Sequence, residues 1–395
     1  MSTRDGLPDY VTAATAARSI TEALGPALLL ASLAAGRHDG DGALVIAGFT
    51  GLAAVSGPLV GLVLDRSGRP RRVITGGTAV LLLVVGLLVW LVPSAPTLVL
   101  VLLACVGGFA HPVLTGGLSA QLPSLVSGPR LDRAYGLDAA TYSLGAVIGP
   151  PAAAAALALG ARGPLLLVAA LLLVVLAFVA RVPFRGHPPR AAGDSWWRDV
   201  ASGFRGLAST RALLFSTVVT TVAFAGQAGF LVAVPLISRA QTGSLAASGW
   251  VFGVAAVGGI LATLVLARRP LRHPDRAVTL STLGIAATYV VMAFSPSFAV
   301  TLVASFVFGA VEGPLITAMF RIRTREADPA VRTSVFTTAA SLRTTVYAAM
   351  TAVCGALVAV GSTWLLLLGA AIHVGSLPLG LWVQRFSPEV RSAAE

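Results

Sequence analysis

The chain has 395 residues, of which 56% are hydrophobic and only 11% are charged, and its mean hydropathy is +0.86. Soluble domains carry about 25% charged residues, so this composition excludes a protein whose main solvent is water. The formal net charge is +12, and all 28 basic residues are Arg. In a soluble chain this excess would indicate nucleic-acid binding. Here the Arg residues lie in short gaps between apolar runs, as in membrane proteins, so we expect a lipid bilayer as partner and no nucleic acid.

Apolar stretches of about 20 residues, the length at which a helix crosses the hydrocarbon layer, recur twelve times along the chain. They are expected at residues 10–34, 43–64, 73–92, 97–122, 135–158, 164–182, 211–237, 246–266, 277–295, 298–320, 334–360 and 363–384. Strands of a membrane β-barrel would alternate apolar and polar residues, and runs such as 79–91 do not alternate. The sequence therefore predicts an all-α integral membrane protein with twelve transmembrane helices.

The Arg residues are distributed unevenly over the gaps between these helices. With the N-terminus inside, the cytoplasmic segments hold 23 Arg, whereas the outer gaps hold only Arg37, Arg162 and Arg239. Cytoplasmic loops of membrane proteins carry the excess of basic residues. This split predicts a multi-pass protein of the bacterial inner (plasma) membrane with both termini in the cytoplasm.

The longest gap separates the sixth and seventh predicted helices. It contains three Pro residues, followed by Trp196, Trp197 and further Arg and aromatic residues, a combination that favours the membrane surface. We expect a short interfacial helix there, with a solvated linker as the alternative. The predicted organisation is an N-terminal six-helix half at 1–182, a cytoplasmic linker at 183–210 and a C-terminal six-helix half at 211–395.

The two predicted halves share short stretches of sequence. A shift of 202 residues places 57–66 (GPLVGLVLDR) on 259–268 (GILATLVLAR), and a shift of 200 aligns Ala-Ala at 139–140 with Ala-Ala at 339–340. Internal repeats are typical of transporters in which two bundles surround a central site. The sequence therefore predicts two pseudo-symmetric halves.

A motif rich in Gly and Arg lies between the second and third predicted helices and reads G-L-V-L-D-R-S-G-R-P-R-R over residues 61–72. Gly61 would let a neighbouring helix approach closely, and Gly68 would permit a tight turn. The carboxylate of Asp65 would accept hydrogen bonds from Arg side chains or from a helix N-terminus. In the second half, Ala267 stands in place of the Asp. We expect a one-sided charged latch at the cytoplasmic rim, made of Gly61, Asp65, Arg66, Gly68, Arg69 and Arg71.

This motif resembles the loop signature of the major facilitator superfamily, G-x-x-x-D-R/K-x-G-R-x-R/K, with one residue inserted near its end. The resemblance implies a fold in which the first, fourth, seventh and tenth helices line a central cavity. It also implies secondary transport by alternating access, in which two halves rock about a site in the middle of the membrane.

A second motif, G-A-V-I-G-P-P-A-A-A, lies in the fifth predicted helix at 145–154. It resembles the antiporter motif g-x-x-x-G-P-x-x-G-G of drug-exporting members, except that Ala replaces the closing Gly residues. Gly145, Gly149 and Pro150 would allow close and kinked packing against the other half. A general packing face of small residues explains the motif almost as well, so export and import both stay open.

Ionisable side chains inside apolar helices cost several kcal/mol and are functional candidates by default. A shift of 201 residues places His111 on Glu312, which gives each half one titratable group at the corresponding helix. Gln227 lies between Gly226 and Gly229 as a neutral ligand contact. The candidates for substrate binding or proton coupling are Arg18, Glu22, His111, Gln227, Glu312 and Arg343.

Structural roles are the alternatives for these residues. Arg18 and Glu22 are spaced i, i+4 and would neutralise each other on one helix face. Glu312 and Arg343, on helices expected to be neighbours, would form a fixed ion pair.

Two further ionisable residues are expected outside the site. Asp138 is expected to be a solvated or capping charge at the start of the fifth helix. His373 lies in a helix expected to be peripheral, where a structural or lipid-facing role is favoured.

Signatures of enzymes and metal sites are missing from the sequence. Without Lys there is no G-x-x-x-x-G-K-[ST] loop for ATP hydrolysis, and the five His residues lack the spacing of a metal site. We expect no enzymatic activity, no cofactor and no metal. The prediction is a monomeric secondary transporter of a small organic or amphipathic molecule that works by alternating access, and proton-coupled efflux is one form that stays open. A metabolite importer or facilitator and a non-transporting membrane receptor are the alternatives.

Overall fold

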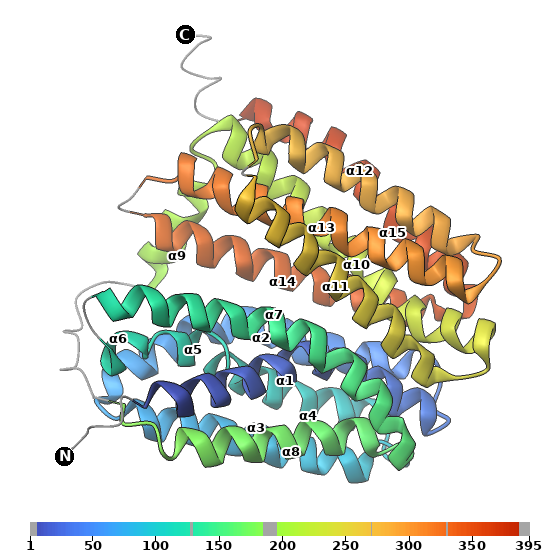
Figure 1. The fold of residues 1–395 in the computed structure, drawn as a ribbon, viewed down its shortest axis with the longest axis horizontal. Coiled ribbons are helices and arrows are strands. Elements are labelled where there is room, and N and C mark those ends of the chain that lie inside the picture. The colour runs from blue at the N-terminus through green and yellow to red at the C-terminus, as the bar shows by residue number, and fades with distance from the viewer. Residues whose placement is uncertain (1–5, 127–128, 185–195, 270, 329–330, 387–395) are drawn as a thin grey trace. The chain divides into compact units, whose positions relative to one another are not determined.

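The computed structural model describes residues 6–126, 129–184, 196–269, 271–328 and 331–386, and these contain helices and no strand (Figure 1). Every segment predicted as a membrane span contains a helix. The longer helices are α1 (Leu7–Ala34), α2 (Asp41–Ser67), α3 (Pro70–Leu91), α4 (Thr97–Ala110), α7 (Pro129–Ala155), α8 (Gly163–Val179), α9 (Trp196–Leu207), α10 (Arg211–Thr242), α11 (Ser248–Arg268), α12 (Pro274–Ala293), α13 (Phe298–Glu326), α14 (Arg332–Ala356) and α15 (Ser362–Val383).

Eight helical segments in the described residues are long and apolar enough to cross a membrane. The helix α8, with 17 residues, is shorter than the usual span. In α1 and α14 the apolar run is interrupted by charge, by Arg18 and Glu22 in the first and by Arg343 in the second. The all-helical membrane character is therefore confirmed, while the count of twelve crossings stays a prediction.

One predicted helix is broken. In the expected continuous span at 97–122, the α-helix ends at Ala110. It is followed by a 3-10 turn, η1 (His111–Val113), and by two short helices, α5 (Gly116–Ser119) and α6 (Leu122–Leu125). Pro112 has no N–H to donate to the helix ladder, and two Gly residues follow four positions later. The break frees backbone carbonyls inside an apolar region, and these require partners.

The chain divides into two compact units, which do not follow the predicted boundaries in every detail. Unit 1 comprises Met1–Ala191 and Ser244–Gly253, and unit 2 comprises Ala192–Gly243 and Val254–Glu395. The first residues of α11 thus cluster with unit 1: a Cβ added to Gly249 would lie 2.8 Å from the Cβ of Ala154 in α7.

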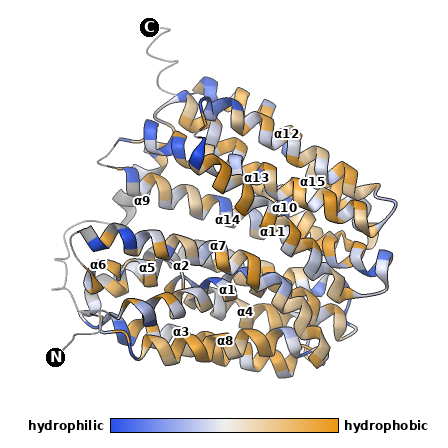
Figure 2. Ribbon diagram, viewed as in Figure 1, coloured by the Kyte–Doolittle hydropathy of each residue, from blue (hydrophilic) through white to orange (hydrophobic). Residues whose placement is uncertain are grey.

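Unit 1 is built around α1, which packs against α7, α8 and α2. The helix α2 packs on α4, and α3 packs on both α4 and α8, at one edge of the unit (Figure 1). Figure 2 shows hydrophobic residues along almost the whole length of α3 and α8. An edge of this kind suits contact with lipid.

Unit 2 is built in the same way around α10, which packs against α14, α15, α13 and α12. Its pairs repeat those of unit 1: α10 with α14 and α15 corresponds to α1 with α7 and α8, and α12 with α15 corresponds to α3 with α8. The pair of α11 and α13, where a Cβ on Gly309 would overlap the carbonyl oxygen of Ala255, corresponds to α2 and α4.

The helix α9 lies in the segment where an interfacial helix was expected. It packs against α14, where Leu207 joins a buried cluster with Leu213, Val335 and Ala339. The side chains of its first six residues, including Trp196 and Trp197, lie outside the described part. Its position at a membrane surface therefore stays a prediction.

Candidate functional site

Arg18 lies at the centre of a buried polar network in unit 1, where its side chain has no exposed surface. Its Nη2 donates to Ser119 Oγ at 2.8 Å and lies 3.5 Å from Asp138 Oδ1. Its Nη1 donates to the carbonyl of Leu114, one of the groups freed by the break after α4. The guanidinium also stacks 4.1 Å from the ring centroid of Tyr142. Arg18 therefore ties α1 to α7 and to the broken segment.

Asp138 completes this network and is not the solvated or capping charge that we expected. It is buried in α7, with Oδ1 accepting from the Tyr10 hydroxyl at 2.7 Å and Oδ2 accepting from Ser119 Oγ at 2.6 Å. Arg18 pairs with Asp138, and Glu22 is exposed, so the alternative of an Arg18–Glu22 couple stays a prediction. A signal was present in the sequence: Asp138 precedes Gly145 by seven residues, which places both on one helix face.

That face of α7 brings its backbone close to α1. A Cβ added to Gly145 would lie 2.6 Å from the backbone carbon of Arg18, and one added to Gly149 would lie 2.6 Å from the carbonyl oxygen of Ser19. Pro150, the next residue, is buried. Close packing is therefore correct, but the two Gly residues contact α1 of the same unit, whereas we expected them to face the other half.

Replacing Gly149 with Ala is expected to destabilise the protein by about 1–3 kcal/mol, because the new methyl group meets backbone atoms that cannot rotate away. Gly136→Ala in the same helix is the matched control, since a Cβ there has nothing within 4 Å. The measurement is the midpoint of thermal unfolding in detergent. Equal midpoints for the two variants would contradict the tight α1–α7 contact.

His111 opens the 3-10 turn η1 and faces α1 and α2. Its Nε2 lies 3.1 Å from Thr21 Oγ1, and its ring packs edge-on against Phe49 with centroids 5.2 Å apart. It is thus held within unit 1, next to the break in the fourth predicted span.

The motif at 61–72 is described only in part. Gly68 ends α2 in the left-handed conformation with φ of 55°, which confirms the predicted turn, and Arg69 and Arg71 are exposed. The predicted close helix approach at Gly61 is wrong for the part of the chain described, since a Cβ there meets nothing within 4 Å. The side chains of Asp65 and Arg66 lie outside the described residues.

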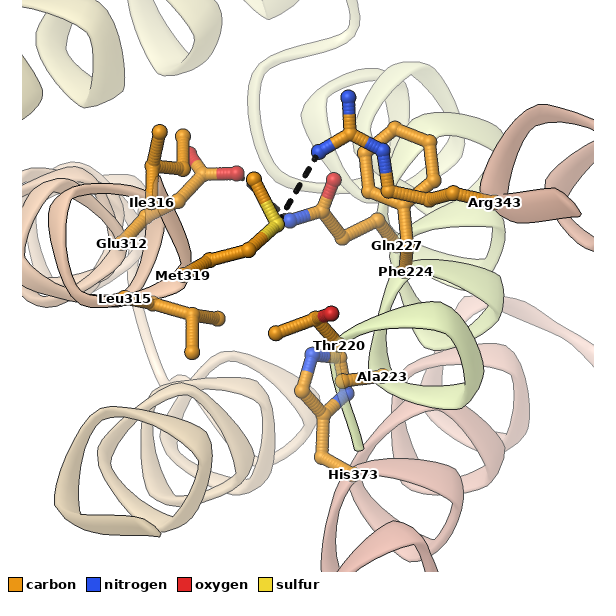
Figure 3. A pocket seen from close by; sticks show the side chains of 10 residues that line it. All are labelled: Thr220, Ala223, Phe224, Gln227, Glu312, Leu315, Ile316, Met319, Arg343 and His373. Carbon is orange, nitrogen blue, oxygen red and sulfur yellow. Dashed lines mark hydrogen bonds between the residues drawn. The ribbon is translucent and has the colours of Figure 1, made fainter. Parts of the chain in front are cut away.

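Unit 2 contains a pocket between α10, α13, α14 and α15 (Figure 3). It encloses about 340 Å³ of empty space, its open mouth included. Three of the predicted site residues, Gln227, Glu312 and Arg343, meet in it. The full lining is Thr220, Ala223, Phe224, Gln227, Glu312, Leu315, Ile316, Met319, Arg343 and His373.

Glu312 and Arg343 face this pocket without a direct ion pair between them in the described residues. Gln227 Nε2 donates to Glu312 Oε1 at 2.6 Å and so joins α10 to α13. The Arg343 guanidinium lies 4.5 Å from the ring centroid of Phe224, and its Nη1 lies 3.9 Å from the Sδ of Met319. The alternative of a fixed Glu312–Arg343 ion pair is therefore not what the geometry shows.

His373 is the pocket residue that sequence reasoning misplaced. It was expected to be peripheral, but it has no exposed surface, and its ring rises from α15 at the floor of the pocket (Figure 3). Its Nδ1 contacts the carbonyl of Gly369 at 2.8 Å, and its ring packs edge-on against Tyr289. Gly226 makes room for the imidazole, since a Cβ there would lie 2.5 Å from Nδ1. The signal for this inward position was the pair of Gly residues, Gly226 in α10 and Gly369 in α15, that lie against each other next to His373.

Long apolar helices with a pocket that contains polar side chains among them are features of a polytopic membrane protein. Residues 10–351 match the model of the Major Facilitator Superfamily. The chain belongs to the major facilitator superfamily, a family of membrane transporters. Among curated protein sequences there is no match.

Solved structures of transporters share the fold at low sequence identity. The nucleoside transporter NupG superposes with a TM-score of 0.76 at 13% identity, covering 94% of this chain and 99% of NupG. The peptide transporter POT in complex with sulfate gives 0.76 at 14% identity, covering 98% and 94%. The human organic anion transporter MFSD10 gives 0.64 at 16% identity, covering 96% and 100%.

Proposed function

We propose that the protein is a secondary active transporter that moves a small organic or amphipathic molecule by alternating access, with the unit 2 pocket as part of its substrate site. The observation that carries this proposal is the pocket itself. It combines an apolar wall with a carboxyl, an amide, a guanidinium and an imidazole group, the composition typical of sites for organic ligands. The similar structures are named for transport of nucleosides, peptides and organic anions. These cargoes are small organic molecules.

Glu312 is the proposed site of proton coupling. It is the acidic residue of the pocket, and its carboxylate is held by the amide of Gln227. A carboxyl group that faces one side of the membrane and then the other carries a proton across if it is protonated on one side and not on the other. Glu22 and His111 are the proposed coupling candidates of unit 1.

The proposed organisation is the one expected from the sequence. Twelve spans form two pseudo-symmetric halves joined by a cytoplasmic linker, and the matching helix pairs around α1 and α10 support this. The distribution of Arg supports cytoplasmic termini in a bacterial inner membrane. The motif around Asp65 and Gly68 serves as a latch at the cytoplasmic rim, and efflux is the proposed direction, with import as the alternative.

A thermal-shift screen of the purified protein against metabolites and drugs tests the pocket, because a ligand of the native state raises the unfolding midpoint. Ile316→Trp fills the pocket from an exposed position on α13. We expect ligands that stabilise the wild type to lose their effect in this variant and to fail to exchange across proteoliposomes. Val307→Trp is the control, since Val307 is equally exposed on α13 but does not line the pocket. Ligands that stabilise all three proteins alike would place the site elsewhere.

A further inference from the structure

The unit 2 pocket holds a positive charge that its own residues leave unpaired. The contacts of Arg343 are an aromatic ring and a thioether sulfur, and its buried Nε has no hydrogen-bond partner. No oxygen atom of a described residue accepts from this guanidinium. The Arg343 side chain is partly buried, and a cation shielded from water without a partner is costly, so an anion at this place would stabilise the site.

Glu312 does not supply that anion. Its Oε1 is engaged by Gln227 at 2.6 Å, and it acts on Arg343 only at longer range. The hydrogen bond from the neutral amide of Gln227 leaves the charge of Glu312 in place, so Glu312 is a counter-charge to Arg343 that makes no direct ion pair with it among the described residues.

A second unpaired guanidinium lies beside the pocket. Arg323, which is 2% exposed, follows Met319 by one turn of α13, and its Nε and Nη2 have no partners. It is close enough to Arg343 for the two charges to repel each other. Arg323 is buried and Arg343 is partly buried, and Glu312 is the one acidic side chain among the described residues that line the pocket. Two guanidinium groups against one carboxyl group leave this part of unit 2 electropositive, which favours anionic ligands over cationic ones.

The floor of the pocket offers a different kind of contact. Because the Nδ1 of His373 lies 2.8 Å from the carbonyl of Gly369, the ring carries its proton there. The buried Nε2 then has a free lone pair and no partner among the described residues. A ligand atom that reaches it must bring an O–H or N–H group. The rest of the lining is mixed: Leu315, Ile316 and Phe224 are apolar, whereas Thr220, Gln227 and Glu312 are polar.

We infer that the pocket binds an organic anion with an apolar body, whose carboxylate pairs with Arg343 and whose opposite end donates a hydrogen bond to His373. This inference rests on the proposed function, in which the same pocket serves transport. It names the substrate class that the contacts select: a hydroxy- or amino-substituted hydrophobic carboxylic acid.

Binding of three matched probes to the purified protein tests this class by calorimetry or thermal shift. The probes are 4-hydroxybenzoate, benzoate, which lacks the donor, and 4-hydroxybenzamide, which lacks the charge. We expect 4-hydroxybenzoate to bind most tightly, benzoate less tightly, and the amide about tenfold or more weaker than the acid, since one ionic hydrogen bond corresponds to about that factor. This comparison needs only the wild-type chain.

Variants of the pocket residues then test which residue binds each end of the ligand. Arg343→Gln should weaken both acids about tenfold or more and leave the amide unchanged. His373→Phe should reduce the affinity for 4-hydroxybenzoate to that for benzoate without changing the latter. Arg325→Gln is the control, because Arg325 lies on α13 but is exposed and paired with Asp275 and Glu326.

The amide binding as tightly as the acid, or neither acid binding at all, would overturn the anionic class. Acid binding that survives Arg343→Gln would do the same. If the pocket instead binds neutral or cationic ligands that Ile316→Trp blocks, the transport site stands and only the class fails. If the acids bind through Arg343 but proteoliposomes carry none of them, the anion site stands and the transport role fails.

Discussion

Glu312→Gln is expected to abolish uphill transport while substrate binding and substrate exchange persist. The substituted amide cannot carry a proton, yet its oxygen still accepts from Gln227, so the bond between α10 and α13 is kept. For one proton per substrate, a gradient of one pH unit sustains about tenfold accumulation. We expect this accumulation to fall to the equilibrium level in proteoliposomes with an imposed pH gradient.

Glu326→Gln is the matched control for this experiment. Glu326 lies at the end of the same helix and pairs with Arg325 outside the pocket, so its neutral variant should accumulate substrate as the wild type does. If Glu312→Gln still drives tenfold accumulation, the proton travels by another residue, and Glu22 becomes the next to test. Loss of exchange as well as accumulation would instead assign Glu312 to substrate binding.

Asp138→Ala is expected to prevent accumulation of folded protein. Removing this carboxylate leaves Arg18 buried without a counter-charge, and breaking a buried pair costs roughly 3–5 kcal/mol. That loss is a large share of the stability of most proteins, about 5–15 kcal/mol. The yield of monodisperse protein by size-exclusion chromatography, and the unfolding midpoint of what remains, measure the effect.

A double replacement distinguishes the effect of the two charges from the effect of the volume that their side chains fill. Arg18→Met with Asp138→Leu removes both charges, and apolar residues in place of a buried pair are often neutral or stabilising. We expect the double variant to fold better than Asp138→Ala. Asp275→Asn breaks the exposed pair with Arg325, whose side chains are 51% and 47% exposed, and should cost no more than about 1 kcal/mol. An equal effect of Asp138→Ala and Asp275→Asn would mean that the Arg18 network contributes little.

The helices and the polar residues of the unit 2 pocket were accessible from the sequence, because both depend on local or repeated signals. Hydropathy alone places the helices, and polar residues in otherwise apolar segments are few, so Gln227, Glu312 and Arg343 stood out. The meeting of Gln227 and Glu312 followed from the resemblance, which placed the seventh and tenth helices at a cavity, whereas Arg343 lies in the eleventh predicted helix and was expected only as a neighbour of Glu312.

The roles of Asp138 and His373 depend on partners far away in the chain. Near the predicted start of a helix, Asp138 has the sequence context of a cap, and only the position of Arg18, 120 residues earlier, makes it a buried counter-charge. His373 is drawn inward because Gly226 leaves a space on α10. Pro112 indicates the break after Ala110, but a hydropathy average over the whole segment does not detect it.

The contact between α10 and α15 also bears on how unit 2 changes shape. At Gly226 and Gly369 the two backbones lie close together beside the His373 ring, and a Cβ on Gly229 would lie 2.5 Å from the carbonyl oxygen of Leu365. Interfaces of this kind have few rotamers to rearrange and resist sliding, so these two helices are expected to move as one rigid body. By contrast, α14 reaches the pocket through the long side chain of Arg343, which rests on Phe224 and Met319. Opening and closing of the pocket would then occur as displacement of α13 and α14 against a fixed α10–α15 frame.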